Sequence, residues 1–144
     1  MNLNLVTIGL SSHLEENKVY HDKISLIPFE NYDQFLSCRL SIRSLNGFLC
    51  HSDCDLTIVN ELRRAYPTSA ILVVCKSYDN AKAIRALSAG ASDIIFSDVA
   101  SSDTFHRIAA RLIQMKTESD VKQTQSQLVE EKLHEQPIAP ASSL

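Results

Sequence analysis

The stretch "LRRAYPTSAILVVCKSYDNAKAIRALSAGASDIIF", residues 62–96, decides the fold. Residues 70–75 are almost all apolar, as expected of a strand that is buried on both faces of a parallel sheet. Residues 79–90 follow with helical spacing, and Gly90 stands where a helix ends. A second short apolar run covers residues 92–96. A strand, a crossover helix and a second strand in this order predict a parallel unit.

The same alternation runs along the rest of the chain. Further strands are expected at residues 3–10, 23–29 and 47–50, and helices at residues 11–22, 31–42, 55–66 and 101–115. Strands that alternate with helices predict an α/β protein. We expect a flavodoxin-like, doubly wound sheet of five parallel strands in the order 2-1-3-4-5, with helices on both faces.

The composition changes after Met115. The remaining residues are polar, rich in Gln, Glu and Ser, and too poor in apolar side chains to fold alone. The sequence therefore predicts an α/β domain at residues 1–115, a helical extension or linker at 116–136 and a disordered tail at 137–144.

Charge and hydropathy exclude several classes of protein. The formal net charge is −3 and the pI is about 5.9, so no basic field points to nucleic-acid binding by this domain. No apolar run approaches the roughly 20 residues that span a bilayer. The first residues lack the basic region of a signal peptide, so we expect a cytoplasmic protein with no membrane partner. Three glycines are too few for a phosphate-cradling loop.

The sequence from 62 to 96 resembles the receiver domain of bacterial response regulators. The resemblance rests on a helix end of the form "LR..YP", an apolar fourth strand, and a helix that closes with "A...GA.D" before the fifth strand. It extends over residues 3–115. It implies a CheY-like fold in two-component signalling, with an acidic pair after the first strand and an aspartate at the end of the third that hold Mg²⁺ and accept a phosphoryl group. It also implies a hydroxyl residue ending the fourth strand and a lysine ending the fifth.

This sequence departs from that pattern at every one of these positions. Gly9 and Leu10 replace the acidic pair, Cys50 or His51 ends the third strand, Cys75 ends the fourth, and Ser97 follows the fifth. Asp53 and Asp55 lie nearby, but in the loop or at the start of the next helix. We therefore expect a degenerate receiver, or pseudo-receiver, that is not an enzyme, accepts no phosphoryl group on aspartate and uses no metal or cofactor.

The predicted function is a non-catalytic signalling module that mediates protein–protein interaction or dimerisation in a bacterial regulator. Regulation of transcription is the expected setting. Two alternatives remain open. A sensor of thiol oxidation or of a metal would use Cys50, His51, Cys54 and Cys75. A flavodoxin-like enzyme with an unrecognised site is the other, because the fold alone does not determine function.

A homodimer is expected through the helix at 79–90, the strand at 92–96 and the helix at 101–115, the face that receivers typically use. Ala83, Ile84 and Leu87 are expected to face the sheet. The predicted contact residues are Ala81, Lys82, Arg85, Ala89, Arg107 and Arg111. An effector domain or a partner regulator is the other expected partner, and the sequence does not identify its output.

Overall fold

The computed structural model describes residues 2–10, 14–15, 18–42, 44–53, 55–98, 101 and 103–118. The chain divides into two compact units, residues 1–112 and 113–144. In the second unit the described residues, 113–118, are helical. In the described part of the chain no helix is both long enough and apolar enough to cross a membrane.

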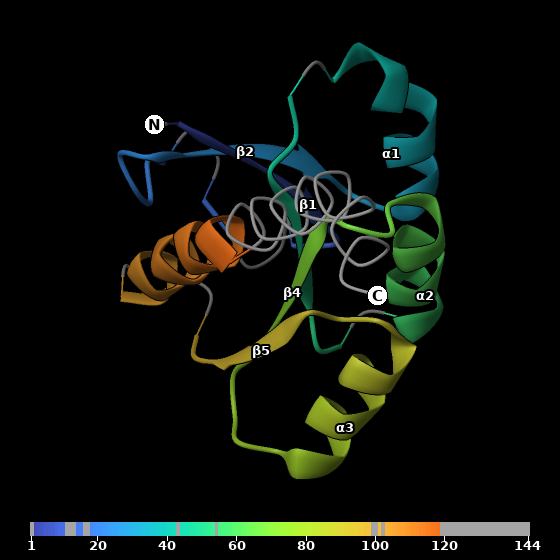
Figure 1. The fold of residues 1–144 in the computed structure, drawn as a ribbon, viewed down its shortest axis with the longest axis vertical. Helices are drawn as coiled ribbons and strands as arrows, with labels where there is room; N and C mark the ends of the chain where they lie inside the picture. Colours follow the sequence, from blue (N-terminus) through green and yellow to red (C-terminus); the bar gives the residue numbers. More distant parts are fainter. Residues whose placement is uncertain are drawn as a thin grey trace, which may run out of the picture. The chain divides into compact units, whose positions relative to one another are not determined.

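The first unit is built on a five-stranded parallel sheet (Figure 1). Its strands are β1 (Leu3–Ile8), β2 (Ile24–Phe29), β3 (Gly47–His51), β4 (Ala70–Cys75) and β5 (Asp93–Phe96). Their order is β2-β1-β3-β4-β5, which confirms the predicted 2-1-3-4-5 topology. Cys50 lies beside Ile8 and Cys75 beside Phe96, so neighbouring strands end at a common carboxyl edge. Pro28 is tolerated in β2 because that strand is at the edge of the sheet.

Three helices cover one face of this sheet (Figure 1). They are α1 (Tyr32–Cys38), which continues into a 3₁₀ turn at Arg39–Ser41, α2 (Leu56–Ala65) and α3 (Asn80–Ala89). Each begins after a polar side chain that accepts hydrogen bonds from backbone N–H groups of the first turn, and these caps are Asn31, Asp55 and Asp79. The core beneath them takes alternate strand residues, which include Val6, Ile8, Phe48, Cys50, Ile71 and Val73.

A fourth helix begins at residue 103, and its residues 103–112, which belong to the first unit, lie on the opposite face of the sheet. Its residues Phe105, Ile108 and Leu112 are buried. A Cβ placed on Gly47 would lie 3.2 Å from Leu112 Cδ2, so this glycine lets the helix approach the sheet. The next residue, Phe48, belongs to the core under α1–α3. Because successive residues of a strand face opposite sides of a sheet, Gly47 and the helix near it lie on the face opposite to α1–α3. The expected helices on both faces are therefore present.

The helix expected at residues 11–22 is not found in the described part of that segment. Residues 14–15 and 18–23 form bends, turns and irregular backbone. The segment offers too few apolar side chains for a helical stripe, and Val19 is 78% exposed. Tyr20 is the residue that anchors it, since its ring contacts Phe105 with 4.8 Å between centroids and its hydroxyl accepts a hydrogen bond from Glu15 N. The described part of this segment is therefore held by the contacts of Tyr20 and not by a helix of its own.

The buried stripe of α3 is not the one that the sequence predicted. Ala86 is the buried residue and Ala83 is half-buried, whereas Ile84 is 63% and Leu87 is 47% exposed. The reason is the close approach of α2 at the end of the helix, where a Cβ on Gly90 would lie only 2.8 Å from Arg63 Cβ. Small side chains fit such a spacing, and the larger ones are left outside.

The sequence signature that carried the family resemblance has a structural role. Arg63 donates hydrogen bonds to Gly90 O (2.9 Å), Ser69 O (2.8 Å) and Ser92 Oγ (2.9 Å). Ser92 Oγ in turn accepts a hydrogen bond from Ile71 N at 3.0 Å. Gly90 has a φ of +123°, a conformation that a side chain would strain. These residues join the end of α2, the start of β4 and the α3–β5 turn, so the signature reports the fold and not the chemistry.

Candidate functional site: a pocket at the carboxyl edge of the sheet

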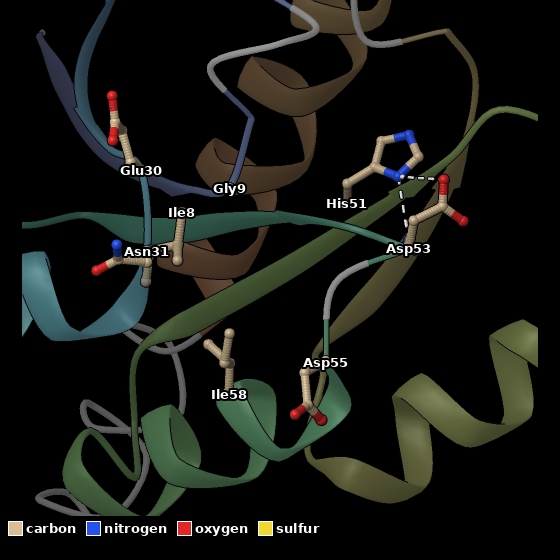
Figure 2. A pocket seen from close by; sticks show the side chains of 8 residues that line it. All are labelled: Ile8, Gly9, Glu30, Asn31, His51, Asp53, Asp55 and Ile58. Carbon is tan, nitrogen blue, oxygen red and sulfur yellow. Dashed lines mark hydrogen bonds and ion pairs between the residues drawn. The ribbon is translucent and has the colours of Figure 1, made fainter.

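A pocket of about 240 Å³ opens where β1, β2 and β3 end (Figure 2). β1 lies between β2 and β3, so the strand order reverses here, and in doubly wound sheets ligands bind at such a point. The residues that line the pocket come from these three strand ends and from the start of α2, and they are Ile8, Gly9, Glu30, Asn31, His51, Asp53, Asp55 and Ile58.

The inner part of the pocket is apolar. Figure 2 shows the side chains of Ile8 and Ile58 turned toward each other. Gly9 has a φ of +74°, and a Cβ there would meet nothing nearer than Glu30 O at 4.0 Å, so the missing side chain leaves open space. Leu10, the other residue at the position of the acidic pair, is fully buried. The two positions therefore contribute backbone and apolar surface in place of carboxylates.

His51 is the last residue of β3 and is only 7% exposed. Its Nδ1 accepts a hydrogen bond from Asp53 N at 3.1 Å and lies 3.3 Å from Asp53 Oδ2. Asp53 Oδ1 lies 3.3 Å from Nζ of Lys82 on α3. A chain of contacts thus links the end of β3 to the first turn of α3 through one carboxylate. Since Asp53 is largely exposed, its ion pair with Lys82 contributes at most about 1 kcal/mol.

The other polar side chains of the pocket cap helices or point away from Asp53. Asp55 caps α2, and the hydrogen bonds that it accepts from Thr57 lower the pKa of its carboxyl group. Asn31 caps α1 by accepting from Gln34 N at 2.8 Å. Glu30 is exposed, and Figure 2 shows its carboxylate turned away from Asp53. Within the described residues, no three His, Cys, Asp or Glu side chains come together in a way that could hold a metal ion.

The ends of β4 and β5 carry self-contained polar contacts. The Cys75 thiol donates to Ser77 O at 2.8 Å. The Ser97 hydroxyl lies 2.6 Å from Thr104 Oγ1, and Thr104 also donates to Asp98 O. Cys75 therefore stands at the end of β4 where the receiver pattern has a hydroxyl residue, and Ser97 follows β5 where that pattern has a lysine.

Of the residues named in the sensor alternative, the two described cysteines, Cys50 and Cys75, do not support it. Cys50 is fully buried in the core and Cys75 is 2% exposed, whereas a reactive thiol needs solvent access. Cys50 pairs alongside Val73, so Cys75 lies two residues further along its strand and does not stand beside Cys50. Cys54 lies outside the described residues.

A receiver-type site for Mg²⁺ and a phosphoryl group does not fit these residues. The end of β3 carries an imidazole whose Nδ1 is engaged by Asp53, and Gly9 and Leu10 supply no carboxylate. Mg²⁺ requires several oxygen ligands in near-octahedral geometry. The pocket therefore occupies the place of such a site with a different set of side chains.

Sequence reasoning missed three polar participants at this edge, Glu30, Asn31 and Lys82, and the two isoleucines of the pocket, Ile8 and Ile58. Glu30 and Asn31 follow β2 directly, so their position after an apolar run was a usable signal. Lys82 is three residues after the cap Asp79, but nothing local in the sequence indicates that it reaches Asp53.

The predicted dimer-contact residues fall into two groups. Ala81 and Arg85 are exposed on α3. The others are engaged within the chain: Lys82 pairs with Asp53, Ala89 is half-buried against the core, Arg107 pairs with Asp103 at 3.2 Å, and Arg111 pairs with Asp93 at 2.8 Å. The exposed apolar surface of this face comes instead from Ile84, Leu87 and Tyr78, whose ring stacks on Phe96 with 4.5 Å between centroids.

No family model and no curated protein matches the chain by sequence. Solved structures do match. A response regulator from Thermotoga maritima aligns with a TM-score of 0.59 at 15% identity, over 79% of this chain and 99% of the other. A receiver domain protein from Clostridium thermocellum gives 0.64 at 16% identity, over 80% and 97%. A CheY-like receiver domain protein from Methanospirillum hungatei gives 0.62 at 13% identity, over 82% and 99%.

Identities this low show the fold and not the chemistry. The five parallel strands in the order 2-1-3-4-5, with helices on both faces, are the architecture of these receiver domains. The similarity says nothing about the side chains at the carboxyl edge of the sheet, which are known only from this chain. The chain thus shares the fold of CheY-like response-regulator receiver domains.

Proposed function

We propose that this chain is a degenerate receiver domain, a non-catalytic signalling module of a bacterial regulator that works without aspartate phosphorylation. The observation that carries the proposal is His51 at the end of β3, buried and engaged through Nδ1 by Asp53. An imidazole in that place offers neither a Mg²⁺ ligand of the oxygen type nor a carboxylate to phosphorylate. The receiver fold of the structural neighbours supports the signalling role.

The remaining positions support the same proposal. Phosphoryl transfer depends on positioning and on neutralising the developing charge, so it needs the metal and the cationic contact together. Ser97 and Cys75 at the two other strand ends hydrogen-bond within the chain. Lys82, a cation at this edge, is held by Asp53.

Incubation with acetyl phosphate and Mg²⁺, followed by intact mass, tests this proposal. We expect no mass change in the full chain under conditions that phosphorylate an authentic receiver domain run alongside. Asp53→Asn and Asp55→Asn variants serve as matched controls for the two acids nearest the end of β3. Stoichiometric gain of one phosphoryl group that either variant abolishes would overturn the proposal.

We further propose that the output is a protein contact, with a second copy of this chain on the face formed by α3, β5 and residues 103–112. Tyr78, Ile84 and Leu87 are 75%, 63% and 47% exposed there, a concentration of apolar surface that a two-fold contact would cover. The ion pairs Asp93–Arg111 and Asp103–Arg107 both form within a single copy of the chain. Apolar side chains, more than charges paired between copies, would therefore make the contact. An effector domain or a partner regulator is the further partner that this role implies.

A further inference from the structure

The pocket at the carboxyl edge of the sheet has room for a small organic molecule. Its volume is about 240 Å³, and an apolar cavity of about 150 Å³ is enough to bind benzene. Ile8 and Ile58 are turned toward each other across its inner part (Figure 2). Gly9 leaves space beside them, because a Cβ there would have Glu30 O as its nearest neighbour, at 4.0 Å. The inner part of the pocket therefore fits a short hydrocarbon group.

The lining of the pocket carries negative charge. Glu30, Asp53 and Asp55 belong to it, and neither a lysine nor an arginine does. Lys82 offsets the charge of Asp53. The carboxylate of Asp55 is ionised at neutral pH, because the hydrogen bonds from Thr57 lower its pKa, and the N-terminus of α2 offsets only about half of its charge. A hollow lined by one sign of charge attracts ligands of the opposite sign, so this pocket favours cations over anions.

The contact of Lys82 indicates which kind of cation this edge accepts. Its Nζ, a primary ammonium, lies 3.3 Å from Asp53 Oδ1, and its side chain is 38% exposed, so much of the hydrocarbon stem is covered. An ammonium group donates three hydrogen bonds and accepts none. The carboxylates of the lining and Glu30 O, on the side of Gly9, are acceptors suited to such a donor.

We propose that the pocket binds a small organic cation, a primary ammonium group on a short branched hydrocarbon, as the input of this signalling module. The hydrocarbon packs between Ile8 and Ile58, and the ammonium group contacts the carboxylates of Asp53 and Asp55. The cation competes with Lys82 for Asp53. This assignment rests on the proposed function, since Mg²⁺ and a phosphoryl group bound at the end of β3 would occupy the same space.

Two-dimensional amide NMR of the full chain, titrated with isopentylammonium, tests the proposal. We expect saturable shifts at the amides of Ile8, Gly9 and Ile58. Isopentanol, the uncharged analogue, should bind at least about fivefold more weakly, the factor that one unit charge at about 4 Å gives in water. Methylammonium should bind at least about tenfold more weakly, because each buried methylene group strengthens binding about fourfold. The anion isovalerate should cause no saturable shift. Isopentylammonium shifts that do not saturate, or isovalerate binding of equal strength, would overturn the proposal.

Two helix caps provide a matched pair of variants. Asp55→Asn removes a charge from the lining and keeps the cap of α2, because asparagine caps helices as well as aspartate does. It should weaken isopentylammonium binding about fivefold. Asp79→Asn makes the same change at the cap of α3, outside the lining, and should bind as wild type does. Lys82→Met should tighten binding, because it removes the competing ammonium group. Equal affinities in all three variants contradict the proposal.

The titrations contain neither Mg²⁺ nor a phosphodonor, so the two proposals fail in different ways. A pocket that does not bind isopentylammonium overturns this assignment and leaves the proposed function standing. Phosphorylation of the chain by acetyl phosphate overturns both.

Discussion

Two buried threonines differ in hydrogen bonding, because one hydroxyl group has partners and the other has none among the described residues. Substituting each of them tests the structure at the scale of single residues. Thr7 Oγ1 has no hydrogen-bond partner among the described residues although Thr7 is 1% exposed. Thr104, fully buried, bonds to Ser97 Oγ and Asp98 O. Thr7→Val should raise the free energy of unfolding by about 1 kcal/mol, and Thr104→Val should lower it by about 1–2 kcal/mol. Urea denaturation measures both, and a common sign would contradict the hydrogen-bond assignment.

Arg63 is the second residue whose role is testable. It makes five hydrogen bonds, to four backbone carbonyl groups and one hydroxyl, with a planar fork that lysine lacks. Arg63→Lys should therefore lower the free energy of unfolding by about 2–4 kcal/mol. Its exposed neighbour provides the control, since Arg64→Lys should stay within about 0.5 kcal/mol of wild type. Equal effects of the two substitutions would mean that the fork geometry is unimportant.

At the scale of elements, α3 carries the proposed dimer contact. Ile84→Asp combined with Leu87→Asp should convert a dimer to a monomer, because each substitution places a charge in the apolar surface that the contact would bury. Leu40→Asp is the control, an apolar side chain that is 95% exposed on the 3₁₀ turn after α1. Sizing at several concentrations reads the result. A wild type that is monomeric throughout, or a double variant that still dimerises, removes this interface.

Elements differ in how far the sequence predicts them, and the difference has physical causes. β4 was predicted at its observed bounds because a strand buried on both faces must be apolar throughout. The helix expected at residues 11–22 was wrong in its described part, since one buried ring, Tyr20, decides the path of that segment. The prediction of which α3 residues are buried was wrong because Arg63 and Gly90 set the distance between α3 and α2. This contact joins residues far apart in the sequence, so local spacing does not indicate it. The contact of Lys82 with Asp53, a residue that lines the pocket, likewise joins two elements that are distant in the sequence.

At the scale of the whole molecule, the predicted boundary near residue 115 remains to be tested. Residues 116–118 are helical, and the rest of the predicted linker and tail, residues 119–144, lies outside the described residues. The sequence of residues 119–144 is polar and offers few apolar side chains that could be buried. A chain ending at residue 118 should therefore melt within about 2 °C of the full chain. A much lower melting temperature would show that the later residues pack against the α/β domain.

The central claim is that the carboxyl edge of this receiver fold has no site for Mg²⁺ and a phosphoryl group. Two-dimensional amide NMR of the full chain, titrated with Mg²⁺ and then with beryllofluoride as a phosphoryl mimic, tests it most directly. The account predicts no saturable shifts at Ile8, Gly9, His51 or Ser97, because among the described residues no three His, Cys, Asp or Glu side chains come together in a way that could hold a metal ion. Saturable shifts at those amides, with the rise in melting temperature that native-state binding produces, would contradict it.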